Sequence, residues 1–171
     1  MKSAWYLTVL LLAITVLGCN DNNSAVPAPD AAVVNSTPMV PAMRLTAADG
    51  SPRTLNEFTG KKIFVNLWAT WCPPCRAEIP SIEALKATVD TGKVEFIMLS
   101  LDENFELAKT FARENSMTAS IYTPADNLPS LFQTEGIPAT FIFNERGELI
   151  RQQLGAADYN TPEYRALLGG R

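Results

Sequence analysis

Two cysteines stand two residues apart in the run Trp68-Ala-Thr-Trp-Cys72-Pro-Pro-Cys75-Arg-Ala-Glu78-Ile-Pro80. The residues before them, 62–68, form a short apolar run rich in β-branched and aromatic side chains, which predicts a central strand. Apolar residues at helical spacing follow from Cys75 to Val89. The sequence therefore places both cysteines where a buried strand passes into a helix.

The rest of the chain from residue 43 onward alternates between strand and helix patterns. Asp49-Gly50 predicts a hairpin near the start, and Asn144-Glu-Arg-Gly147 predicts a second one near the end. The other expected elements are a buried strand at 94–101, a helix capped by Asp102 or Asn104, a strand near 120–123, a short helix near 129–134, and a last helix from Thr161 to Gly169-Gly170. This order predicts an α/β fold with a central sheet covered on both sides.

The composition limits the chemistry. The 171 residues are 47% apolar and 19% charged, as in a globular protein. A net charge of −4 without a basic patch argues against nucleic acid as a partner. The absence of histidine excludes Ser-His-Asp and Cys-His nucleophile systems, Cys2His2 zinc sites and His-ligated haem. Chemistry is left to cysteine, carboxylate or backbone groups, and we expect no metal and no cofactor.

The N-terminal residues indicate export. A short positive start precedes an apolar run, 4–18, that is shorter than the roughly 20 residues of a membrane-spanning helix. The run ends in Val16-Leu-Gly-Cys19, which resembles the lipobox of bacterial lipoprotein signal peptides. The resemblance implies that 1–18 are removed and that Cys19 is lipidated and anchors the protein to a lipid membrane. An ordinary cleaved signal peptide, with Cys19 incidental, is the alternative; both place the protein where thiols tend to be oxidised.

A composition change separates this anchor from the folded part. Residues 19–40 comprise Cys19 and a stretch that is mostly Ala, Pro, Asn, Ser and Val, which predicts a flexible tether. The domain is then expected at 41–171.

The Cys72/Cys75 pair has three possible roles. A structural zinc site needs four ligands, which one cysteine pair without histidine does not supply. An inert disulfide would close a loop too short to constrain the unfolded chain much. A redox-active pair suits the junction, because the positive end of a helix lowers the pKa of a thiol at its start. Cys72 should then be the exposed attacking thiol and Cys75 the buried resolving thiol.

The two prolines between the cysteines predict the direction of the chemistry. Pro73 suits the first turn of a helix. Neither Pro73 nor Pro74 has an N–H, so two potential donors to the Cys72 sulfur are missing. The reduced form is therefore less stabilised than in a strong oxidant, and we expect a potential nearer the roughly −270 mV of thioredoxin than the roughly −120 mV of DsbA.

The run from Phe64 to Pro80 resembles the TlpA/ResA-type, thioredoxin-like thiol–disulfide oxidoreductases, and Gly136-Ile-Pro138 extends the match. The resemblance implies a thioredoxin-like three-layer fold, with a central mixed sheet flanked by helices and an N-terminal β-hairpin extension. It implies that Cys72 is the nucleophile and Cys75 the resolving cysteine of a redox disulfide. Pro138 is expected to be a cis-proline opposite the pair, where it presents the backbone of Ile137 to a substrate strand.

Three further side chains follow from the resemblance. Glu78 lies one helical turn past Cys75 and is expected to take the proton of the resolving thiol, with a solvated surface carboxylate as the alternative. Thioredoxins place a buried aspartate where this chain has Asn66, which cannot titrate. Trp71 is expected at the rim of the site in contact with substrate, whereas Trp68 is expected in the core.

These features predict a membrane-anchored, extracytoplasmic thiol–disulfide oxidoreductase on the periplasmic side of a bacterial membrane that reduces protein disulfides. The family implies a membrane thiol transporter of the DsbD or CcdA kind as electron donor, and its substrates include apocytochrome c. Two alternatives are a peroxiredoxin-like antioxidant enzyme and a metal-delivery lipoprotein on the same fold. The first would need proline at Val65 and threonine at Ala69; the second adds a histidine and a wider cysteine spacing.

Overall fold

The computed structural model describes residues 37–170. The predicted signal peptide, Cys19 and nearly all of the predicted tether lie outside the described residues. Twelve elements follow one another along the described chain: β1 (Arg44–Ala47), β2 (Pro52–Thr54), η1 (Leu55–Phe58), β3 (Lys62–Trp68), α1 (Pro73–Lys86), β4 (Val94–Ser100), α2 (Phe105–Glu114), β5 (Ser120–Pro124), η2 (Ser130–Phe132), β6 (Ala139–Phe143), β7 (Leu149–Leu154) and α3 (Pro162–Leu168). The η elements are short 3-10 helices.

A mixed seven-stranded sheet runs through the domain in the order β2-β1-β5-β4-β3-β6-β7. β3 pairs in parallel with β4 and antiparallel with β6, so the strand that leads to the cysteines lies inside the sheet as predicted. The β1–β2 hairpin extends the sheet by pairing with β5. The fold class expected from the sequence is therefore confirmed.

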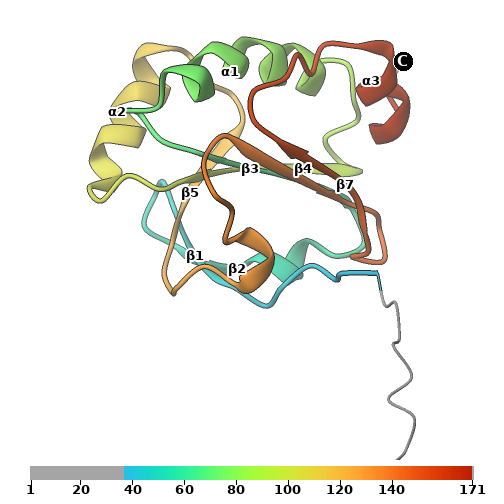
Figure 1. The fold of residues 1–171 in the computed structure, drawn as a ribbon, viewed down its shortest axis with the longest axis horizontal. Coiled ribbons are helices and arrows are strands. Elements are labelled where there is room, and N and C mark those ends of the chain that lie inside the picture. The colour runs from blue at the N-terminus through green and yellow to red at the C-terminus, as the bar shows by residue number, and fades with distance from the viewer. Residues whose placement is uncertain (1–36, 171) are drawn as a thin grey trace, which may run out of the picture. The chain divides into compact units, whose positions relative to one another are not determined.

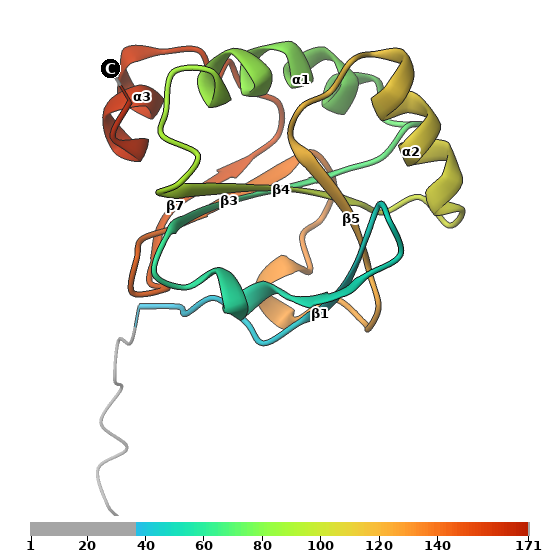
Figure 2. The same ribbon diagram turned by 180° about the vertical axis from the view of Figure 1, so that it is seen from behind.

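The sheet divides the protein into layers, and Figures 1 and 2 show α1, α2 and α3 together over one of its faces. Alternate side chains of β3 point to opposite faces, so Phe64 and Trp68 join the core under the helices while Ile63, Val65 and Leu67 join the core on the other side. Residues of η1 and η2 cover that second face. By the same alternation, Asn66 lies on the helix side of the sheet.

Local sequence signals set the helix boundaries. Cys72 caps α1, and Pro73 stands at its first turn. Thr161 caps α3, and Gly169 ends it with a positive φ of 75°. Asn104 caps α2 through a bond from the Glu106 amide, which resolves the choice that the sequence left open between Asn104 and Asp102.

Backbone pairing in the domain begins slightly earlier than the predicted boundary at residue 41. The amide of Leu149 donates to the Pro38 carbonyl at 2.8 Å, and the amide of Val40 donates to the Gly147 carbonyl at 2.7 Å. Residues 38–40 therefore belong with the domain, not with a free tether. Between residues 37 and 170, none of the helices has the length and apolar character needed to cross a bilayer.

Candidate active site

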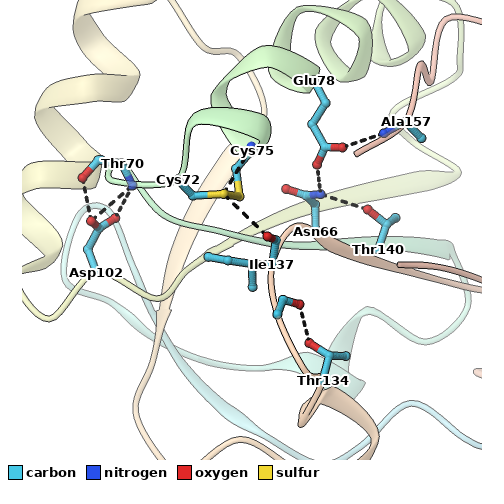
Figure 3. The surroundings of a disulfide bond; sticks show 11 residues. Asn66, Thr70, Cys72, Cys75, Glu78, Asp102, Thr134, Ile137, Thr140 and Ala157 are labelled. Carbon is cyan, nitrogen blue, oxygen red and sulfur yellow. Dashed lines mark hydrogen bonds between the residues drawn. A yellow bond between two sulfur atoms is a disulfide. The ribbon is translucent and has the colours of Figure 1, made fainter. Parts of the chain in front are cut away.

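Cys72 and Cys75 form a disulfide at the N-terminus of α1, with their Cα atoms 5.3 Å apart (Figure 3). The Cys72 sulfur acts as the helix cap and accepts a hydrogen bond from the Cys75 amide at 3.2 Å. Cys75 is fully buried and Cys72 is 4% exposed. The greater burial of Cys75 agrees with the prediction, but the expected exposure of Cys72 is wrong for this oxidised form.

The helix start offers few donors to the Cys72 sulfur. Pro73 and Pro74 occupy the first two helical positions and carry no N–H. The Cys75 amide is the first backbone N–H after the sulfur, and it makes the bond just described. A thiolate on Cys72 would thus meet the helix dipole and one amide donor.

The loop before β6 brings a carbonyl against the disulfide. The Ile137 oxygen lies 3.8 Å from the Cys72 sulfur, and the Ile137–Pro138 peptide bond is cis, as expected. A disulfide sulfur has no hydrogen to donate, so this contact can become a hydrogen bond only when Cys72 is a protonated thiol. Thr134 donates to the Gly136 carbonyl at 2.8 Å within the same loop. Ile137 and Pro138 therefore lie beside the pair although they are more than 60 residues away in sequence.

Trp71 marks the solvent side of the site. Its side chain is 65% exposed, as expected at the rim, and its contact with substrate stays a prediction. Trp68 is fully buried in the core, as predicted. Trp71 lines a mainly apolar hollow together with Leu101, Leu128, Phe132, Gln133, Thr134, Gly136 and Ile137. An apolar side chain near a substrate disulfide could occupy this hollow.

Glu78, one turn past Cys75 on α1, is buried and is not a solvated carboxylate (Figure 3). It is 3% exposed, and its two oxygens accept from the Asn66 side-chain amide at 2.7 Å and from the Ala157 amide at 3.1 Å. Burial raises the pKa of Glu78 from 4.5 to about 7, and the two hydrogen bonds partly oppose that shift. A carboxyl group that changes its charge near neutral pH is suited to exchanging a proton with a neighbouring thiol.

Asp102 is a site residue that the sequence analysis missed, because it was considered there only as a helix cap. Its carboxylate accepts from the Thr70 amide at 3.1 Å, from the Thr70 hydroxyl at 2.6 Å and from the Ser100 hydroxyl at 2.8 Å. These bonds anchor the turn two residues before Cys72. No local pattern signals them, since Thr70 and Asp102 meet only when β3 and β4 pair.

A second group missed by the sequence analysis lies on the other side of Glu78. Thr140 of β6 accepts from the Asn66 amide at 2.9 Å, and its hydroxyl lies 2.6 Å from the Tyr159 hydroxyl. All three side chains are fully buried. The segment between β7 and α3 thus supplies both Ala157 and Tyr159 to the surroundings of Glu78.

Comparison with known proteins agrees with this geometry. The family model described as Redoxin matches residues 27–168. The chain belongs to the Redoxin family. Among its relatives is the thiol-disulfide oxidoreductase ResA of Geobacillus kaustophilus, 27% identical over 82% of this chain and 80% of the relative. ResA of Bacillus thuringiensis subsp. konkukian is 29% identical over 67% of each chain.

Solved structures of thiol–disulfide proteins share the fold of this Redoxin-family chain. StoA from Bacillus subtilis is 25% identical with a TM-score of 0.57, covering 71% of this chain and 93% of StoA. A DsbE-type thiol:disulfide interchange protein from Chlorobium tepidum, 22% identical, shares the fold with a TM-score of 0.66, covering 78% of this chain and 92% of that one. The Redoxin match and the ResA relatives identify the chain as a TlpA/ResA-type thiol–disulfide oxidoreductase.

Proposed function

We propose that the protein is a membrane-tethered, extracytoplasmic reductant of protein disulfides. The observation that supports this most directly is the Cys72–Cys75 disulfide at the start of α1, with the Ile137 carbonyl 3.8 Å from the Cys72 sulfur. A sulfur at a helix start is activated, and a backbone segment beside it can align a substrate strand.

The proposed reaction begins with both cysteines reduced. The Cys72 thiolate attacks one sulfur of a substrate disulfide, forming a mixed disulfide and releasing the other substrate sulfur as a thiolate. Cys75 then loses its proton to Glu78 and attacks Cys72, which forms the enzyme disulfide and frees the second substrate sulfur. Two electrons pass to the substrate, and the enzyme ends in the oxidised form that the structure describes.

The surroundings of Cys72 support reduction as the direction. A strong oxidant needs a heavily stabilised thiolate. Here one amide donates to the sulfur, two prolines offer no donor, and a carbonyl oxygen faces it. Equilibration against glutathione should give a potential near the roughly −270 mV of thioredoxin, and a value above about −150 mV would contradict the direction.

The cellular setting is proposed from the sequence. Residues 1–18 would be the signal peptide, Cys19 the lipidated residue, and the following residues a tether to the domain. Because an exported enzyme is separated from the thiols of the cytoplasm, a membrane thiol transporter of the DsbD or CcdA kind would re-reduce Cys72 and Cys75. Among protein disulfides, the proposed substrate is apocytochrome c with its haem-binding cysteines oxidised.

A mixed-disulfide trap tests this function. In Cys75→Ala, the attacking thiol of Cys72 remains but there is no resolving thiol to break the mixed disulfide, so substrate should stay covalently attached at Cys72. The matched control is a protein with both Cys72→Ser and Cys75→Ala, which should capture nothing. A Cys75→Ala protein that captures no more than this control in an envelope extract would contradict the proposal.

A further inference from the structure

Asn66 is buried between Glu78 of α1 and Thr140 of β6. It lies on β3 opposite Thr140 of β6, and its side chain points to the face covered by α1 (Figure 3). Its amide nitrogen is 2.7 Å from one Glu78 oxygen and 2.9 Å from the Thr140 hydroxyl. Through Thr140 the chain of contacts reaches Tyr159.

The hydrogen atoms in this chain follow from the donors available. The Asn66 nitrogen donates one hydrogen to Glu78 and the other to Thr140, which leaves the Thr140 O–H free to donate to Tyr159. The other Glu78 oxygen accepts from the Ala157 amide. Both carboxyl oxygens face donors, which is the arrangement that suits an ionised carboxylate.

One polar atom in this arrangement makes no hydrogen bond. The Asn66 side-chain oxygen is buried and has no hydrogen-bond partner within residues 37–170. A buried, unpaired carbonyl oxygen destabilises the fold, and such an atom in a native core calls for an explanation.

Protonation of Glu78 would change the hydrogen bonds that its carboxyl group requires. A carboxylic acid needs an acceptor for its O–H, but its oxygens face the Asn66 and Ala157 nitrogens. A half-turn of the Asn66 amide brings the unpaired oxygen to the place of the nitrogen. It can then accept from the Glu78 acid and from Thr140, and Thr140 accepts from Tyr159. Every bond from Glu78 to Tyr159 reverses, and within Asn66 the nitrogen takes the position that the unpaired oxygen held.

We propose that Asn66 is the positioning residue for Glu78, bonding its ionised form through the amide nitrogen and its protonated form through the amide oxygen. This inference rests on the proposed function, in which Glu78 receives the Cys75 proton. The exchange lets the proton arrive without leaving the carboxyl group unpaired and without moving α1. A second carboxylate at this position would instead repel the charge that Glu78 acquires.

The other titratable groups near Glu78 leave it as the group that changes charge near neutrality. Tyr159, from the segment before α3, has a raised pKa because of burial and the nearby Glu78 charge, and Tyr164 of α3 is raised by burial first. Both phenols therefore stay neutral. On α1 itself, Cys75 lies one turn before Glu78 and is tied up in the disulfide of the oxidised protein. Glu78 itself has a pKa of about 7.

Nuclear magnetic resonance of the oxidised protein tests the proposal without any substrate. We expect the Glu78 carboxyl carbon to titrate and the Asn66 side-chain amide resonances to shift with the same midpoint, because the amide hydrogens lose their acceptors when Glu78 is protonated. Asn66 resonances that stay constant through the Glu78 titration would overturn the proposal. This wild-type measurement stands even if a variant fails to fold.

Asn66→Leu supplies the second readout. Loss of the donor to the ionised form should raise the Glu78 pKa by about one unit or more. Ser100→Ala is the matched control, since it also removes a buried hydrogen bond from a neighbouring strand but one that ends on Asp102; it should leave the Glu78 pKa unchanged. An equal Glu78 pKa in Asn66→Leu and wild type would contradict the role. If these shifts occur while Cys75→Ala traps no substrate, the positioning role stands and the proposed function fails.

Discussion

Two buried carboxylates flank the disulfide, and they differ in their hydrogen-bond partners. Asp102 accepts from one amide and two hydroxyls, which tie the turn before Cys72 to β4. Glu78 accepts from one backbone amide and from a side-chain amide that can also offer an oxygen. Asp102 joins the turn before Cys72 to β4, whereas burial raises the pKa of Glu78 to about 7, so that Glu78 gains and loses a proton near neutral pH. Both side chains are buried, so the comparison shows that hydrogen-bond partners distinguish a carboxylate that anchors a turn from one that is held by an amide able to reorient.

The largest effect should come from removing the Asp102 side chain. Asp102→Ala leaves the part-buried Thr70 amide and two hydroxyls without their acceptor, which should lower the free energy of unfolding by about 3 kcal/mol. Urea denaturation of the oxidised protein measures this. Disulfide-reductase activity should fall as well, because the turn that leads to Cys72 loses its anchor. Unchanged stability in Asp102→Ala would remove the distinction between the two carboxylates.

A pH-dependent effect of intermediate size should come from Glu78. An acid whose pKa is higher in the folded protein binds an extra proton on folding, so the stability it contributes is lost as the pH rises from about 4.5 to about 7. The shift corresponds to about 3 kcal/mol, which wild type should lose between pH 4 and pH 8 and Glu78→Gln should not. Urea denaturation at the two pH values gives the difference. Parallel losses in both proteins would show that Glu78 does not titrate in the fold.

The same variant separates a catalytic from a structural role for Glu78. If the carboxyl takes the Cys75 proton, the pH profile of insulin-disulfide reduction should lose its component near pH 7 in Glu78→Gln. A pH profile identical to that of wild type would leave Glu78 with a structural role only.

The smallest effect on stability should come from the exposed rim. Trp71 is 65% exposed, so Trp71→Ala should change the free energy of unfolding by less than about 0.5 kcal/mol. If the hollow beside Trp71 receives substrate, KM for a protein disulfide should rise about fivefold, equivalent to about 1 kcal/mol of binding. Steady-state kinetics measure this, and an unchanged KM would place substrate elsewhere.

Much of this architecture could be read from short-range patterns. The 62–68 run becomes β3, Cys72 caps α1, and Thr161 with Gly169 bounds α3, because strand periodicity and caps depend on neighbouring residues. The short helix expected near 129–134 is a three-residue 3-10 turn, Ser130–Phe132. A local pattern indicates where such a turn lies but does not decide between an α-helical and a 3-10 conformation.

The amino-acid sequence by itself determined the pair of cysteines at a strand-to-helix junction, the lack of donors from Pro73 and Pro74, and a carboxylate one turn past Cys75. These are properties of residues within one or two turns of each other. The tertiary structure alone decided that Asp102 holds Thr70, and that Asn66, Thr140 and Tyr159 surround Glu78. Those partners come from different strands and from the segment before α3. Their hydrogen bonds exist only after the sheet has paired and the core has excluded water, and that same exclusion brings the pKa of Glu78 to about 7.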